Sequence, residues 1–130
     1  MTGTMANTVL IVEDYADARN FMKTLLVNMG QNVMTAADGQ QAVDYAAEVL
    51  PDLIIMDLSL PVMDGLLATR LIRANKNAAK TPIICITAHS NYYQRMALEA
   101  GCNEVIQKPI DVNVLETAIK KYITIDEEIA

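Results

Sequence analysis

The chain has 130 residues, of which 52% are hydrophobic and 20% charged, and its formal net charge is −6. This length suits one domain that buries roughly two thirds of the surface its unfolded chain exposes, and no apolar run approaches the ~20 residues that span a bilayer. We therefore expect a cytoplasmic globule that binds no membrane, and the negative charge argues against direct binding of nucleic acid.

The first strand is predicted at residues 8–12, after an aperiodic stretch at 1–7 that we expect to be a flexible tail. The strand is a β-rich apolar run, and it ends at two acids, Glu13 and Asp14. Residues 15–29 then place apolar side chains at three- and four-residue spacing, which predicts a helix. We expect the inward face of this helix to contain Ala18, Phe21, Met22, Leu25, Leu26 and Met29.

A second strand and helix are predicted at residues 32–36 and 42–50, with a turn at Asp38 and Gly39 between them. The run at 53–56 is different, because it is apolar at every position. Such a run is too short for a helix and lacks the alternation of a half-exposed strand, so it predicts a strand buried on both faces. It ends at an acid, Asp57.

The third helix is predicted at residues 67–72, with Leu67, Ala68, Leu71 and Ile72 facing inward. Another uninterrupted apolar run at 83–86 predicts the fourth strand, which ends at Thr87. Cys85 in this run and Cys102 further on form no Cys-x-x-Cys pair, so we expect two buried free thiols.

The last third of the chain repeats the alternation. A fourth helix is predicted at residues 93–100, and a short fifth strand at 104–107 ends at Lys108. A final helix at 111–122 begins at Asp111, which we expect to cap it. Residues 124–130 are expected to form a short acidic tail.

Five strands alternating with five helices predict right-handed crossovers and a parallel sheet covered on both faces. The expected fold class is α/β, a doubly wound three-layer sandwich. The strands are too few for a (β/α)₈ barrel, and no glycine-rich loop follows the first strand, so nucleotide-binding versions of this architecture lack support.

Polar side chains gather where the strands end. The carboxyl ends of parallel strands meet at one edge of the sheet, and ligands bind at that edge. Two carboxylates 4 Å apart repel each other by roughly 4 kcal/mol at an effective dielectric near 20, which favours a bound cation. Because the candidate ligands are hard oxygens, we expect Mg²⁺ or Mn²⁺. The residues expected at this edge are Glu13, Asp14, Asp57, Thr87 and Lys108.

The same residues match a known family. Residues 8–123 resemble the receiver domain of response regulators, the phosphoacceptor half of two-component signalling. The similarity implies a flavodoxin-like sheet with strand order 2-1-3-4-5. The matching pieces are Glu13-Asp14, Asp57, Leu60-Pro61-Val62-Met63-Asp64-Gly65, Thr87-Ala88 and Lys108-Pro109.

The resemblance implies a role for each residue. Asp57 would accept a phosphoryl group from a histidine kinase or a histidine phosphotransfer protein. Asp14, Asp57 and the backbone carbonyl of Ser59 would bind Mg²⁺, with Glu13 acting mainly through a water molecule. Thr87 and Lys108 would complete the phosphoryl site. A cis Lys108–Pro109 bond is also implied.

The resemblance further implies an output surface on the fourth helix, the fifth strand and the last helix. Receivers commonly carry an aromatic residue three positions before the lysine, but this chain has Val105 there. We therefore expect movement of the loop at 88–91, followed by Tyr92 and Tyr93, to replace the usual aromatic switch. Ser59 and His89 occupy positions that tune phosphate lifetime in the family.

Several alternatives remain open. Asp14 alone could cap the first helix, and Lys108 alone could be a surface charge. The same chemistry also suits a haloacid-dehalogenase-like phosphatase, but such enzymes need an acid two residues after the nucleophile, and Ser59 stands there. A receiver-like adaptor that works without phosphorylation is the third alternative. We expect a stand-alone switch, because no output domain follows in the sequence.

Overall fold

The computed structural model describes residues 7–88 and 91–123. Strands and helices alternate throughout these residues, as the sequence predicts. The strands are β1 (Thr8–Val12), β2 (Asn32–Ala36), β3 (Leu53–Asp57), β4 (Ile83–Thr87) and β5 (Glu104–Gln107). The helices are α1 (Ala16–Asn28), α2 (Gly39–Val49), α3 (Gly65–Ala74), α4 (Asn91–Ala100) and α5 (Val112–Tyr122).

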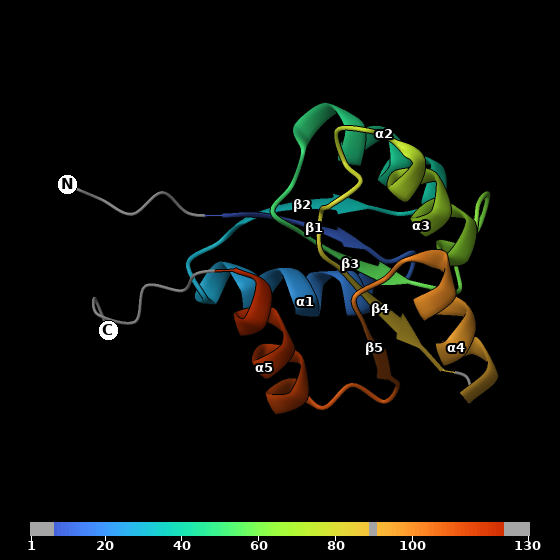
Figure 1. Ribbon diagram of the computed structural model, residues 1–130. Helices are drawn as coiled ribbons and strands as arrows, with labels where there is room; N and C mark the ends of the chain where they lie inside the picture. The colour runs from blue at the N-terminus through green and yellow to red at the C-terminus, as the bar shows by residue number, and fades with distance from the viewer. Residues whose placement is uncertain (1–6, 89–90, 124–130) are drawn as a thin grey trace.

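The strands form one parallel sheet in the order β2-β1-β3-β4-β5. Helices α1 and α5 cover one face, and α2, α3 and α4 cover the other, which confirms the three-layer sandwich and the predicted strand order (Figure 1). Since β1, β3 and β4 each have a strand on both sides, their carboxyl ends lie side by side in the middle of one edge.

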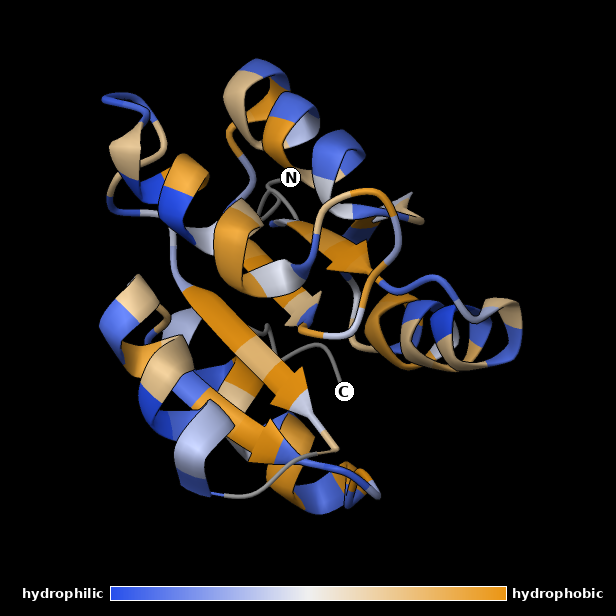
Figure 2. Ribbon diagram, turned by 90° about the vertical axis from the view of Figure 1, so that its right-hand side faces the viewer, coloured by the Kyte–Doolittle hydropathy of each residue, from blue (hydrophilic) through white to orange (hydrophobic). Residues whose placement is uncertain are grey.

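The sheet separates two apolar cores because successive side chains of a strand point to opposite faces. In β1, Leu10 and Val12 belong to the core under α2, α3 and α4, whereas Val9 and Ile11 belong to the core under α1 and α5. Figure 2 shows the central strands as hydrophobic along their length. The uninterrupted apolar runs of β3 and β4 are therefore explained by burial on both faces.

Three of the inward positions predicted on α1 and α3 are wrong. Phe21 is 50% exposed, Leu67 43% and Leu71 39%. Each flanks the buried stripe of its helix, which contains Met22 and Leu26 on α1 and includes Ala68, Thr69 and Ile72 on α3. Ala68 and Thr69 are fully buried, and the Thr69 hydroxyl donates a hydrogen bond to the carbonyl of Gly65 at 2.7 Å.

Aspartates begin three of the helices. The Asp111 carboxylate accepts hydrogen bonds from the N–H groups of Asn113 and Val114, which confirms the predicted cap of α5. Asp38 caps α2 and Asp64 caps α3 in the same way. Each side chain satisfies a backbone donor that the first turn of a helix leaves unpaired.

The amino edge of the sheet is tied together by side chains. Arg73, at the end of α3, donates to the carbonyls of Thr81 and Gly101, each at 2.7 Å, and to the Asn103 side chain at 2.9 Å. The same Asn103 oxygen accepts the Ile83 N–H at 2.8 Å. These bonds join α3, β4 and the segment before β5 at the edge opposite the acids.

Cys85 and Cys102 are both buried and free, as expected. No helix within residues 7–88 or 91–123 has the length and apolar character needed to cross a membrane. The expected tails, residues 1–7 and 124–130, lie outside the described residues except for Asn7, whose N–H donates to the Gln31 side chain at 3.1 Å.

The loop between β3 and α3 contains a strained residue. Val62 has φ 66° and is 85% exposed, and the Met63 N–H bonds the Pro61 carbonyl at 2.6 Å around it. A left-handed conformation costs an L-residue roughly 1–2 kcal/mol, and asparagine tolerates it far better than a β-branched residue.

We predict that Val62→Asn raises the free energy of unfolding by about 1 kcal/mol, because it relieves backbone strain and the exposed side chain loses no packing. Urea denaturation measures the change. The matched control is Val27→Asn, at an exposed position of α1 with helical backbone, which should not stabilise the protein. Equal effects of the two substitutions would contradict the strain at Val62.

Candidate functional site

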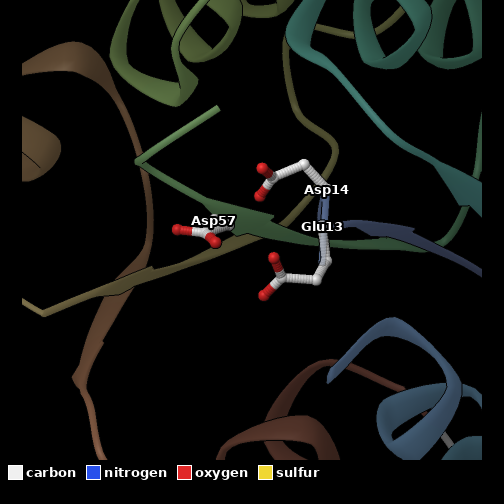
Figure 3. Close-up of side chains that lie close together, drawn as sticks. All are labelled: Glu13, Asp14 and Asp57. Atoms are coloured by element: carbon white, nitrogen blue, oxygen red, sulfur yellow. The ribbon is translucent and has the colours of Figure 1, made fainter. Parts of the chain in front are cut away.

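Three carboxylates converge at the carboxyl edge of the sheet. Glu13 and Asp14 follow β1, and Asp57 ends β3 (Figure 3). Each offers one oxygen, and these oxygens lie within 4.8 Å of one another. Glu13 and Asp57 are only 2% and 3% exposed, whereas Asp14 is exposed. The predicted acid cluster therefore exists, with two buried members and one open to solvent.

The Asp57 carboxylate is held by donors on both oxygens. Its Oδ1 accepts the Ser59 N–H at 3.0 Å, and its Oδ2 lies 3.1 Å from the Lys108 ammonium. The backbone around it is fixed by the sheet, because Asp57 pairs with Ile86 of β4 and the Leu58 N–H bonds the Ile86 carbonyl at 3.0 Å. The direction of this carboxylate is thus set by β3 and β4 together.

Lys108 reaches across the edge from the end of β5. Its ammonium lies 3.1 Å from Asp57 and 3.9 Å from Glu13. The period of the strands explains the meeting, because Glu13, Asp57 and Lys108 each lie two residues beyond a side chain of the α1–α5 core. The Lys108 N–H bonds the Thr87 carbonyl at 2.8 Å, and the Lys108–Pro109 bond is cis, as expected. Lys108 is therefore more than a surface charge, because its ammonium pairs with the buried Asp57.

Glu13 has a perturbed pKa. Burial, together with the neighbouring charge of Asp57, raises the pKa of Glu13 to about 7 against the opposing effect of a hydrogen bond from the Tyr15 N–H. That bond measures 3.1 Å to Oε2. The direction follows from the position of Glu13, since burial and a nearby negative charge both disfavour its ionised form.

Asp14 does not cap the first helix. The N-cap of α1 is Tyr15, and its side chain makes no capping hydrogen bond. The Glu13 carboxylate instead accepts the Tyr15 N–H. The capping role considered for Asp14 is therefore wrong, and its carboxylate lies with those of Glu13 and Asp57.

The remaining predicted residues lie around this group. Thr87 is buried at the end of β4, one residue beyond the partner of Asp57. Ser59 is exposed, and its N–H bonds Asp57. Val105 is half-buried on β5 and packs against the core under α2, α3 and α4. His89 lies outside the described residues.

Two glycines allow the loop after β3 to pack closely. A Cβ on Gly65 would lie 2.3 Å from the Asp57 carbonyl oxygen, and one on Gly39 would lie 2.0 Å from the Met63 carbonyl oxygen. Any side chain at Gly65 would therefore push against the backbone of Asp57. The close approach of Gly65 to the Asp57 backbone therefore requires a glycine at this position.

The oxygen donors fit a small hard cation. Carboxylates and backbone carbonyls are the ligands that Mg²⁺ prefers, and the described residues bring no histidine or cysteine into this group. Three carboxylates and one ammonium give the edge a formal excess of negative charge. The structure therefore brings together, at one sheet edge, a buried carboxylate with fixed donors, two further acids and a lysine.

This is a doubly wound α/β domain with its polar site at the carboxyl edge of the sheet, which is where such domains bind ligands. The model of one family, the response regulator receiver domain, matches residues 9–120. The match covers most of the chain, so the chain belongs to the receiver domain family of response regulators.

A curated relative of the chain is also a response regulator. The response regulator ArlR of Staphylococcus aureus is 41% identical over 113 residues, which cover 86% of this chain and 50% of ArlR. The chain therefore spans about half the length of this curated relative.

Two solved structures are also similar. The receiver domain of the sensor histidine kinase PA1611 from Pseudomonas aeruginosa superposes with a TM-score of 0.84 and 36% identity, covering 91% of this chain and 98% of that one. That structure holds a magnesium ion in its active-site cleft. The chemotaxis protein CheY4 of Vibrio cholerae gives a TM-score of 0.85 at 28% identity, covering 92% and 100% of the two chains.

One residue near the acids is absent from the sequence prediction. Arg19 of α1 bonds the backbone carbonyls of Glu13 and Asp14. Residue types in the sequence give little indication of such a contact, because its acceptors are backbone groups that every residue possesses. The one signal available is a positive charge five residues after the acid pair.

We predict that Glu13 makes the stability of the metal-free protein depend on pH. Its folded pKa of about 7 exceeds its ordinary value of 4.5, so the folded state binds more protons between these values. The contribution of Glu13 to the free energy of unfolding is fully present below pH 4.5 and is lost as the pH rises to about 7. Glu13→Gln should therefore gain stability relative to the wild type across this range.

Denaturation in the presence of a chelator, at a series of pH values, measures this difference. Glu48→Gln, at an exposed position of α2, is the matched control, and its difference from the wild type should stay constant. A constant difference for Glu13→Gln as well would contradict the raised pKa.

Proposed function

We propose that the chain is a phosphoacceptor switch in which Asp57 receives a phosphoryl group from a histidine kinase or a histidine phosphotransfer protein. One observation carries the proposal: both oxygens of a buried carboxylate have fixed donors, Ser59 and Lys108, beside two further acids. Membership of the receiver family supports the same role.

The residues suited to hold the cation are Asp14, Asp57 and the backbone carbonyl of Ser59, with Glu13 acting through a water molecule. The oxygen-rich donor set and the magnesium ion in the PA1611 receiver support Mg²⁺, with Mn²⁺ as a substitute. When bound, the divalent cation would supply charge neutralisation for the phosphoryl oxygens.

The residues of the chain supply positioning and charge. A carboxylate oxygen of Asp57 attacks phosphorus, and the bond between phosphorus and the donor histidine nitrogen breaks, returning its electron pair to the imidazole. Lys108, already paired with Asp57, offers its ammonium to the incoming phosphoryl oxygens. The Thr87 hydroxyl completes their hydrogen bonds. Phosphoryl transfer depends mainly on such placement and electrostatics.

The chemistry of this switch is limited to phosphorylation and autodephosphorylation at Asp57, and the chain turns over no separate substrate. A haloacid-dehalogenase-like phosphatase would need an acid at position 59, where a serine stands, and the family match favours the receiver. A phosphorylation-independent adaptor would not need Lys108 within 3.1 Å of the buried Asp57.

The partners follow from the same role. A kinase-driven phosphorylation cycle places the chain in the cytoplasm, with a histidine-phosphorylated protein as donor and an effector protein as target. The expectation of a stand-alone switch stays a prediction, because the chain spans about half of ArlR. We propose receiver-domain boundaries at residues 8–123.

The effector surface is proposed on α4, β5 and α5. Exposed apolar side chains on these helices include Tyr92, Leu98 and Val114. A hollow of about 210 Å³ separates α4 from the loop after β3, and Tyr93 lines it together with Leu58 and Ser59. Movement of Thr87 would reach the start of α4, where Tyr92 and Tyr93 stand, along the chain at 88–91, of which residues 89–90 lie outside the described residues. This route needs no aromatic ring at Val105.

We predict that Asp57→Asn folds normally and forms no phosphorylated species, because the amide is a poor nucleophile. Intact mass, measured in acid-quenched samples during incubation with acetyl phosphate and Mg²⁺, detects the added phosphoryl group. The control is Asp44→Asn on the exposed surface of α2, which should label like the wild type. Labelling of Asp57→Asn at the wild-type rate would exclude Asp57 as the acceptor.

We also predict that beryllofluoride, which mimics an aspartyl phosphate, changes the backbone NMR shifts of residues 91–97 as well as those around the acids. The added negative charge draws Thr87 inward, toward the phosphoryl group, and this moves the start of α4. Asp57→Asn should show neither change. Shift changes confined to the acid cluster would contradict the proposed route to the start of α4.

A further inference from the structure

Arg19 lies where it can control the loop that carries two of the acids. From the first turns of α1, its Nη1 donates to the Glu13 carbonyl at 3.0 Å and to the Asp14 carbonyl at 3.3 Å. These carbonyls belong to the two residues whose carboxylates leave the end of β1 toward Asp57 (Figure 3). One guanidinium therefore holds both peptide planes that follow the acids.

The other contacts of this loop do not replace Arg19. The Glu13 N–H bonds the Ala36 carbonyl at 3.0 Å, and the Tyr15 N–H bonds the Glu13 carboxylate. These bonds anchor the end of β1 and the start of α1, whose N-cap lacks a side-chain bond. By contrast, Arg19 bonds the Glu13 and Asp14 carbonyls themselves, and it so restrains the backbone from which the two side chains leave.

Arg19 also adds a positive charge near the proposed cation site, which would weaken cation binding. Its side chain is half-buried, so water and salt screen this repulsion in part. Alignment of the carboxylates has the larger effect on Mg²⁺ affinity, because Mg²⁺ requires a nearly ideal octahedral arrangement of ligands. Loss of an orienting contact typically weakens metal affinity about tenfold or more. The two effects have opposite signs, so affinity measurements separate them.

We propose that Arg19 is a positioning residue that aligns the Glu13 and Asp14 carboxylates for Mg²⁺. The inference rests on the proposed function, because it concerns the cation of that same site. It assigns to Arg19 no contact with the cation or the phosphoryl group. Its effect passes through two backbone carbonyls.

Calorimetric titration of the whole chain with Mg²⁺, and separately with Ca²⁺, tests the proposal. Arg19→Ala should bind Mg²⁺ about tenfold more weakly than the wild type. Ca²⁺ accepts irregular ligand geometry, so its affinity should fall less, and the ratio of Mg²⁺ to Ca²⁺ affinity should drop. A merely destabilised fold would lower both affinities together and leave that ratio unchanged.

Arg19→Lys is the second variant, because its ammonium can still donate to a carbonyl and keeps the charge. We expect it to restore part of the Mg²⁺ affinity lost in Arg19→Ala. The matched control is Arg70→Ala, at an exposed position of α3, which should leave both affinities unchanged. Thermal unfolding in chelator verifies that each variant is folded at the temperature of titration.

The outcomes distinguish the inference from the proposed function. Unchanged or tighter Mg²⁺ binding by Arg19→Ala, in a protein whose affinity falls with Asp14→Asn, would overturn the positioning role alone. An unchanged ratio of Mg²⁺ to Ca²⁺ affinity would do the same. Absence of Mg²⁺ binding by the wild-type chain would overturn the cation of the proposed function and this inference with it.

Discussion

Repulsion among three carboxylates governs the carboxyl edge of this sheet. At about 4 Å two such charges repel by roughly 4 kcal/mol at an effective dielectric near 20. Two of the three, Glu13 and Asp57, are buried, so the fold must hold them in place against this force. The buried strands β1 and β3 supply that hold, and Lys108 supplies the opposing charge. The sheet thus keeps three negative charges together at its edge, and a cation there would relieve their repulsion.

The order of the elements could be predicted from the sequence because burial leaves a plain pattern. Strands buried on both faces appear as uninterrupted apolar runs, and their ends appear as the first polar residues. Helix faces are harder to predict, since an apolar side chain beside the buried stripe looks like one within it. The inward positions predicted for Phe21, Leu67 and Leu71 are wrong for this reason, since these side chains are exposed while Ala68 and Thr69 are fully buried.

The candidate site divides in the same way. Glu13, Asp14, Asp57 and Lys108 could be predicted because each follows a strand, and parallel strands bring their ends together. The role of Arg19 could not, because its acceptors are backbone carbonyls. The close approach of Gly65 to the Asp57 carbonyl was equally hidden, since a glycine in a loop has many possible reasons.

The bonds of Arg73 separate what holds the sheet together from what lies at its acidic edge. Their acceptors are neutral and come from two segments, the residues before β4 and those before β5, and none of them belongs to the acid cluster. Loss of these bonds would weaken the packing of α3 against the amino ends of β4 and β5 and leave the three carboxylates in place. The stability of the domain and the chemistry of its acidic edge can therefore vary independently.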